Sequence, residues 1–171
     1  MRALLLALLV GSAQAAPTDL FVEITKDTGP SEVVEVIAAT PSPLLTGYQS
    51  KIRKCDLLVN KGRFDPVGEL AVIEVVHEAG HCLALRNGLT NLDAPNINIE
   101  KIADVYAVAW MYYNRKDLYE RSVYLLLQQR MENRRRDRLY DTLLAIRWMQ
   151  KLLPMVPPTD PWELTVRMFK E

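Results

Sequence analysis

The only two histidines of the chain lie four residues apart within one apolar stretch, and no other feature constrains the fold as strongly. The segment His77-Glu78-Ala79-Gly80-His81 is enclosed by the largely apolar residues of positions 70–85. Residues four apart share one face of a helix, so both imidazoles can reach the same metal ion. Glu78 lies one position further round the helix, where its carboxylate can reach a metal-bound water without being a ligand. The stretch therefore predicts a buried central helix that carries a metal site.

This helix has recognisable ends in the sequence. Asp65 is a suitable N-cap, and Pro66 is a favourable first helical residue. Asn87-Gly88 is typical of a C-terminal stop, because glycine readily adopts the left-handed conformation that ends a helix. Inside the helix, Gly80 costs about 1 kcal/mol relative to alanine, so we expect a neighbouring element to pack closely against it.

A second helix, predicted at residues 99–113, carries two acidic residues on an otherwise apolar segment. Glu100 and Asp104 are four residues apart and share a face with Ala103, whose small side chain lets this helix lie close to its neighbour. We therefore expect this face to pack against the helix that carries the two histidines.

The third metal ligand has to be a carboxylate or a cysteine, because no third histidine is present. Catalytic zinc takes three protein ligands and one water, and the downstream carboxylates are Asp93, Glu100 and Asp104. Glu100 is best placed, since Asp104 one turn later can accept the free ring N–H of a ligand histidine. We expect one zinc ion bound by His77, His81 and Glu100.

The pattern His77-Glu-x-x-His81 followed by Glu100-x-x-Ala-Asp104 resembles the gluzincin metallopeptidases. That group includes thermolysin-like enzymes, membrane-embedded prenyl-protein peptidases and ImmA/IrrE-type peptidases. The resemblance covers about residues 65–113 and implies a zinc metalloendopeptidase that acts on peptides or proteins. It also implies that the two histidines and Glu100 bind zinc, that Glu78 is the general base and that Asp104 supports a ligand histidine.

The group's oxyanion-stabilising residue has no obvious counterpart. Several members use a further histidine or a tyrosine, and no further histidine is present here. A tyrosine or an arginine would have to take this role, and the candidate tyrosines are Tyr48, Tyr106, Tyr112, Tyr113 and Tyr119.

The alternative function is an exported helical binding or scaffold module whose metal site is structural or non-catalytic. A structural site usually has four protein ligands and no use for an acid at position 78.

The N-terminus is typical of a secretory signal peptide, which we predict at residues 1–15. Arg2 precedes the short apolar run of residues 3–10, and Ala13-Gln14-Ala15 fits a cleavage site. The run is too short to span a bilayer, which needs about 20 residues, and no other stretch is long and apolar enough to be a membrane anchor. We expect one domain at residues 16–171, exported to the periplasm or secreted.

Cysteine content and charge add further expectations. Cys55 and Cys82 are either bridged, as an oxidising compartment permits, or two buried thiols. The chain carries 21 basic and 21 acidic residues, so its net charge gives no reason to expect a nucleic-acid partner. The basic run at residues 130–138 is interpreted as a solvated helix face, with an anionic partner or a membrane surface as the alternative.

The remaining segments predict a small sheet before the motif helix and helices after it. Strands are expected at residues 19–25 and 56–60; residues 31–39 fit a strand or a helix, and residues 44–54 are weakly helical. Further helices are expected at residues 118–139 and 140–153, and a short last one is capped by Asp160. The predicted fold class is α+β, mainly helical and zincin-like, with the N-terminal sheet packed on the central motif helix and a C-terminal helical bundle.

Overall fold

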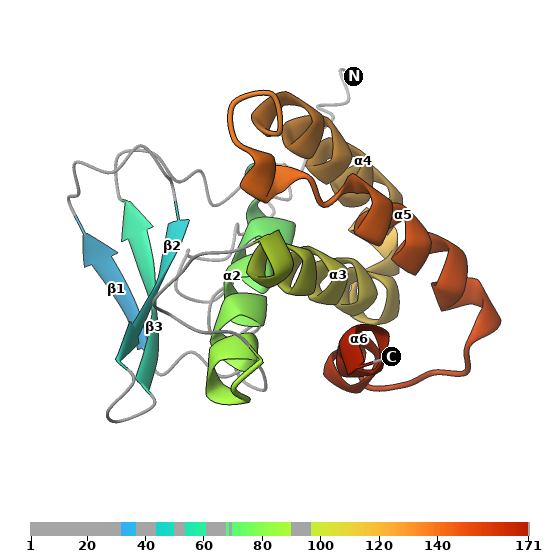
Figure 1. Ribbon diagram of the computed structural model, residues 1–171, viewed down its shortest axis with the longest axis horizontal. Helices are drawn as coiled ribbons and strands as arrows, with labels where there is room; N and C mark the ends of the chain where they lie inside the picture. The colour runs from blue at the N-terminus through green and yellow to red at the C-terminus, as the bar shows by residue number, and fades with distance from the viewer. Residues whose placement is uncertain are drawn as a thin grey trace, which may run out of the picture.

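The computed structural model describes residues 32–36, 44–49, 54–60, 68, 70–89 and 97–170. In chain order these form strands β1 (Glu32–Val36), β2 (Leu44–Gln49) and β3 (Lys54–Asn60), and helices α2 (Ala71–Arg86), α3 (Ile97–Asn114), α4 (Lys116–Asn133), α5 (Leu143–Leu152) and α6 (Pro161–Lys170). Two 3-10 helices, η2 (Arg138–Tyr140) and η3 (Leu153–Met155), lie on either side of α5. Figure 1 shows the strands beside α2 and the other helices gathered around α3. The predicted signal peptide and the predicted strand at residues 19–25 lie outside the described residues.

The three strands pair in the order β1-β3-β2, with β1 parallel and β2 antiparallel to β3. The prediction that residues 44–54 are weakly helical is wrong. Residues 44–49 form β2, in which Leu44 lies opposite Val59 and Gln49 opposite Lys54. Pairing with β3 overrides the weak local preference, because strand formation depends mainly on the neighbouring strands.

The predicted α+β, zincin-like fold class is also wrong, because the described part of the chain is mainly helical and, within it, the expected N-terminal sheet contributes only Leu57 to the main core. The described residues from 68 to 170 form helices, turns and short connections. The main core is helical: apart from Leu57 of β3, its buried side chains come from α2 to α6 and η3. The physical reason is that these helices have enough apolar surface to cover one another, so their core does not depend on a sheet.

Helix α2 is buried on nearly all sides, as its continuous apolar sequence predicts. It begins at Ala71 rather than at the predicted Pro66, since Gly68 and Leu70 are not helical. The predicted stop at Asn87-Gly88 is confirmed: Gly88 has a φ of +65°. There the backbone N–H groups of Asn87 and Leu89 donate to carbonyl groups of the last turn.

Close contact between α2 and α3 confirms the reason expected for Gly80. A Cβ atom at Gly80 would lie 2.9 Å from the Cα atom of Ala103 and 3.3 Å from its carbonyl oxygen. The two helix backbones can approach this closely only because position 80 has no side chain. Glu100 and Asp104 lie on either side of Ala103 along α3, so the same contact brings them next to the histidine face of α2.

The C-terminal helices are placed largely as predicted, with differences at their boundaries: α5 begins at Leu143 rather than at residue 140, which belongs to η2. Helix α4 ends at Asn133 rather than at residue 139, because the Asn133 carbonyl accepts the backbone N–H groups of Arg136 and Asp137 in a turn. The predicted cap of the last helix is confirmed, since the backbone N–H of Glu163 donates to Asp160 Oδ1 over 2.8 Å. No described helix has the length and apolar character needed to cross a bilayer.

Candidate metal centre

His77 and His81 lie one turn apart on the face of α2 that contacts α3. Their exposed fractions are only 7% and 8%, and their ring centroids are 4.5 Å apart with the rings nearly perpendicular. The ligand atoms of His77, Glu78 and His81 all lie within 4.8 Å of one another. This buried His-Glu-His group can hold a metal ion.

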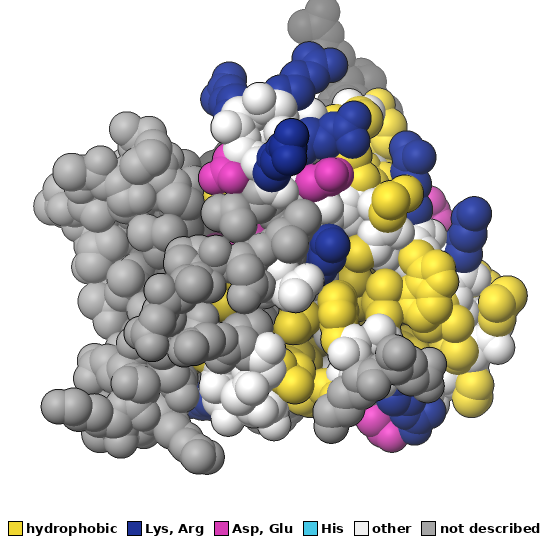
Figure 2. All heavy atoms as spheres, in the orientation of Figure 1, with side chains coloured by type: hydrophobic (Ala, Val, Ile, Leu, Met, Phe, Trp, Pro, Cys, Tyr) yellow, Lys and Arg dark blue, Asp and Glu magenta, His cyan; other side chains and the backbone are white. Residues whose placement is uncertain are grey.

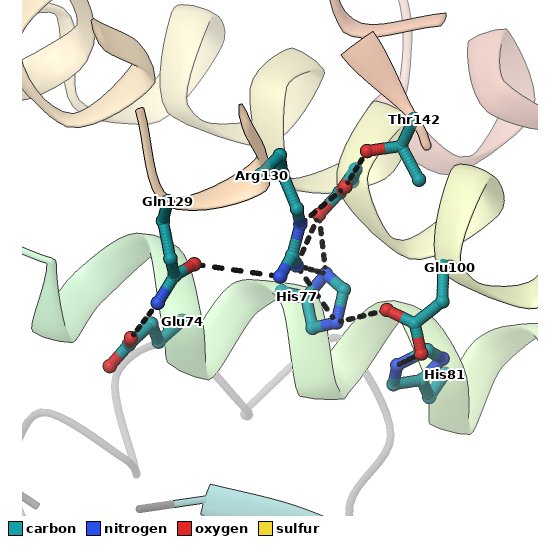
Figure 3. Close-up of polar contacts among 8 residues, drawn as sticks. Glu74, His77, His81, Glu100, Gln129, Arg130 and Thr142 are labelled. Carbon is teal, nitrogen blue, oxygen red and sulfur yellow. Dashed lines mark hydrogen bonds and ion pairs between the residues drawn. The ribbon is translucent and has the colours of Figure 1, made fainter. Parts of the chain in front are cut away.

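Glu100 approaches both histidines from α3 (Figure 3). Its Oε2 atom lies 3.4 Å from His77 Nε2, and its Oε1 atom lies 3.5 Å from His81 Nε2. Both separations are long for a good N–H···O hydrogen bond, whose usual range ends near 3.2 Å. Among the described residues, Glu100 Oε2 and His81 Nδ1 are buried atoms without a hydrogen-bond partner. The site therefore has polar atoms that converge without satisfying one another.

Asp104, which is fully buried, holds the other ring nitrogen of His77. Its Oδ1 atom lies 2.7 Å from His77 Nδ1, which leaves His77 Nε2 facing Glu100. The hydroxyl of Thr142, at the start of α5, donates to Asp104 Oδ2 over 2.5 Å. Asp104 thus occupies the supporting position that the spacing of Glu100 and Asp104 led us to expect.

Arg130 of α4 completes this contact and was missed by the sequence interpretation. Its Nε and Nη2 atoms donate to Asp104 Oδ2 and Oδ1 over 2.8 and 2.7 Å, a bidentate pair. Nη2 also lies 3.2 Å from His77 Nδ1. Treating the whole run at residues 130–138 as a solvated face is therefore wrong at its first residue, since Arg130 is only 6% exposed. Its spacing from the buried Val123 and Leu126 on the same helix face was the signal that could have identified it.

The neighbouring residue Gln129 links α4 to α2 a second time. Its side-chain amide donates to Glu74 Oε1 over 3.0 Å, one turn before His77 (Figure 3). Burial raises the pKa of Glu74 despite this hydrogen bond. The α2 face that carries the histidines is thus fixed by polar contacts from both α3 and α4.

The charges around His77 determine what can occupy the site. Burial alone would lower the pKa of His77, but Asp104 and Glu100 outweigh it and raise that pKa to about 10. Burial and the charge of His77 lower the pKa of His81. Burial would raise the pKa of Asp104, yet Arg130 and His77 hold it well below its usual range. Without a metal, His77 is thus a cation in an ion-pair network, and a metal ion would compete with its proton.

The tyrosines predicted for the oxyanion role are involved in other contacts. Tyr106 packs edge-to-face on Trp162, and Tyr112 packs edge-to-face on both Tyr113 and Tyr119. The side chain of Tyr48 lies outside the described residues, as does the candidate ligand Asp93.

A different tyrosine, Tyr140 of η2, lies close to the site. Its ring centroid is 5.2 Å from the guanidinium carbon of Arg130. Its pKa is raised first by burial and then by the charge of Glu100, with a smaller contribution from Glu78.

Cys55 and Cys82 form a disulfide that joins β3 to α2 directly beside His81, with Cα atoms 5.7 Å apart. The bond ties the strand segment to the helix that carries both histidines.

Comparison of the chain with protein-family models, with curated proteins and with solved structures finds no match. Any statement about function therefore depends on the geometry of the site.

Proposed function

We propose that the protein is a zinc-dependent peptidase whose metal is bound by His77, His81 and Glu100. The spacing of the ligand atoms is the observation that carries the proposal. Glu100 Oε2 lies 3.4 Å from His77 Nε2, and Glu100 Oε1 lies 3.5 Å from His81 Nε2, so this carboxylate faces one ring nitrogen of each histidine. A zinc ion bound by both nitrogens at about 2.0–2.1 Å would take one of these two oxygens as its third protein ligand.

Glu100 fits the role of third ligand better than Glu78, although Glu78 belongs to the tight group on α2. Each oxygen of Glu100 faces the Nε2 atom of one histidine, so a metal bound by both nitrogens would lie against this carboxylate. Glu78 is adjacent to His77 in sequence and therefore points about 100° away from it round the helix. That direction suits a carboxylate that contacts a water beside the metal.

The ligand set supports a catalytic rather than a structural site. Three protein ligands leave one position for water, whereas structural zinc usually has four protein ligands. When bound, zinc would polarise a carbonyl group and lower the pKa of its water towards 7. Glu78 would accept a proton from the attacking water and return it to the leaving amine. Asp104 and Arg130 would fix the ring of His77 through its Nδ1 atom.

Tyr140 is our proposed donor to the developing oxyanion. Its ring centroid lies 5.2 Å from the guanidinium carbon of Arg130, whose Nη2 atom contacts His77, so the ring borders the site. A neutral phenol can donate a hydrogen bond to an oxygen that gains negative charge. Tyr140→Phe should lower kcat more than it changes KM, and Tyr113→Phe is the matched control on α3.

The central experiment compares the protein with its Glu78→Gln and Glu132→Gln variants. We expect about one zinc ion per chain in all three proteins by metal analysis. Cleavage of a mixed peptide library should be lost only in Glu78→Gln, because Glu132 is an exposed residue of α4. A native protein that binds no zinc would refute the proposal. Zinc binding without peptide cleavage would instead favour the alternative, an exported helical binding module with a non-catalytic metal.

We further propose that the protein is exported. The disulfide between Cys55 and Cys82 supports this, because such bonds persist in oxidising compartments and are rare in reducing ones. N-terminal sequencing of protein recovered outside the cytoplasm should begin at Ala16. A mature protein that retains Met1 would contradict the signal peptide.

A further inference from the structure

The outer side of α5 exposes large apolar side chains. Leu144 is 82% exposed, Trp148 is 48% exposed and Met155, in η3, is 76% exposed. These positions follow the helical spacing of four and then seven residues, so they lie along one side of α5 and its extension. The opposite side carries Leu143, Ile146 and Met149, which are buried. Tyr124 of α4 is the other large hydrophobic residue that is exposed in the described part of the chain.

The charge that accompanies this surface is positive. Arg147 and Lys151 lie between the exposed apolar residues and are themselves exposed. No acidic residue occurs from position 142 to position 159. Figure 2 shows hydrophobic side chains gathered over α5 with Lys and Arg side chains along the edges. We call Leu144, Arg147, Trp148, Lys151 and Met155 the α5 ridge.

More positive charge lies immediately before α5. Arg134, Arg135 and Arg136 are exposed in the connection between α4 and η2, and Arg138 is exposed at the start of η2. Two exposed acidic residues accompany them, Asp137 and Asp141, and Asp141 lies 3.8 Å from Arg134. The four arginines outnumber these two carboxylates, so the surface beside the α5 ridge stays positive.

We propose that the α5 ridge docks on a membrane surface that contains anionic lipids. Exposed leucine, tryptophan and methionine can insert at the level of the headgroups, and tryptophan favours that interface. Basic residues beside them attract anionic lipids, each contributing about fivefold to binding. Positive charge without carboxylates on the ridge itself matches an anionic headgroup layer. This inference does not depend on the proposed peptidase activity.

The test uses the full purified protein with vesicles of two compositions, in chelator to remove any metal contribution. We expect sedimentation with vesicles of equal parts phosphatidylcholine and phosphatidylglycerol, and little with phosphatidylcholine alone. High salt should release the protein, because it screens exposed charges. Tryptophan fluorescence should shift to the blue on binding, and Trp148→Phe should remove the shift, since Trp110 and Trp162 are less exposed.

Matched variants separate the two parts of the surface. Arg147→Gln with Lys151→Gln should weaken binding to the anionic vesicles about 25-fold, as two basic residues are lost. Leu144→Ser with Trp148→Ser should remove the fluorescence shift and most of the binding. Tyr124→Ser and Lys116→Gln, exposed residues of α4 outside the ridge, should leave binding unchanged. Circular dichroism should be the same for all of these surface variants.

Three results would overturn the inference. The first is no binding to anionic vesicles, and the second is equal binding by the ridge and control variants. The third is a concentration-dependent dimer in size-exclusion chromatography that Leu144→Ser abolishes, because the ridge would then be an interface between copies of the chain.

Discussion

Replacing Arg130 with methionine should strongly destabilise the protein even when no metal is bound. The substitution keeps an unbranched side chain of similar reach and removes the guanidinium that neutralises Asp104. Asp104 is fully buried and Arg130 is 6% exposed, so water cannot replace the lost contacts. Two hydrogen bonds of 2.8 and 2.7 Å disappear together with the buried opposite charge.

The expected loss is about 3–5 kcal/mol, the cost of removing one partner of a buried ion pair. This is a large part of the 5–15 kcal/mol that separates most folded domains from their unfolded state. Arg167→Met is the control, because Arg167 pairs with Glu163 on α6 while both side chains are more than half exposed. Exposed pairs contribute between about 0 and 1 kcal/mol, so the control should be nearly neutral.

Urea unfolding in the presence of a chelator measures both variants without any contribution from metal. The double variant Arg130→Met with Asp104→Leu should recover part of the lost stability, because it removes the buried carboxylate that the single variant deprives of its guanidinium partner. A loss below about 1 kcal/mol for Arg130→Met would refute the reasoning. A double variant destabilised by the sum of the two single effects would show that the two residues do not act as a pair.

Three further predictions follow from other contacts. Gly80→Ala should destabilise the protein by about 1–3 kcal/mol in urea unfolding, because its Cβ atom would lie 2.9 Å from the Ala103 backbone; unchanged stability would contradict this. Removing the disulfide by Cys55→Ala with Cys82→Ala should cost about 3–4 kcal/mol for a sequence separation of 27, and a variant that melts like the oxidised protein would be evidence against it. In chelator, the pKa of His77 is raised from 6.5 to about 10 in the folded state, so its stabilising contribution is complete below pH 6.5 and lost as the pH rises through about 10. The unfolding midpoint should fall over that range and fall less in His77→Gln; an equal fall in both proteins would show that His77 is not responsible.

The parts of the site that follow from local spacing were predictable. His77 and His81 share a face because a helix brings residues four apart together, and the same rule applies to Glu100 and Asp104. The contact that joins the two pairs was also foreseeable, since Gly80 in a helix interior is costly unless a neighbour needs the space. Local rules therefore identified the two faces that α2 and α3 turn towards each other.

The parts that depend on distant segments were not predictable. Arg130 belongs to a run of arginines, and only its position on the buried side of α4 distinguishes it from its exposed neighbours. The hydroxyl of Thr142 donates to Asp104 because the connection before α5 places it there, and no sequence pattern near Thr142 predicts that position. The strand β2 forms because β3 lies beside it, and the main core is helical because α2 to α6 cover one another's apolar faces. In each case the deciding interaction comes from a residue far away in sequence.

Arg130 also explains why two similar carboxylates on one helix would have different roles. Both oxygens of Asp104 are already engaged, by Arg130, by Thr142 and by His77 Nδ1. A carboxylate in that state has little capacity left for a metal, and its charge is balanced by the guanidinium. Glu100 has no such partner among the described residues beyond the two histidines, and its Oε2 atom is buried without a hydrogen bond. A positive charge between Glu100 and the histidine nitrogens would balance the negative charge of Glu100. A proton on His77 can supply that charge, and a metal ion between Glu100 and the Nε2 atoms of the two histidines could replace it.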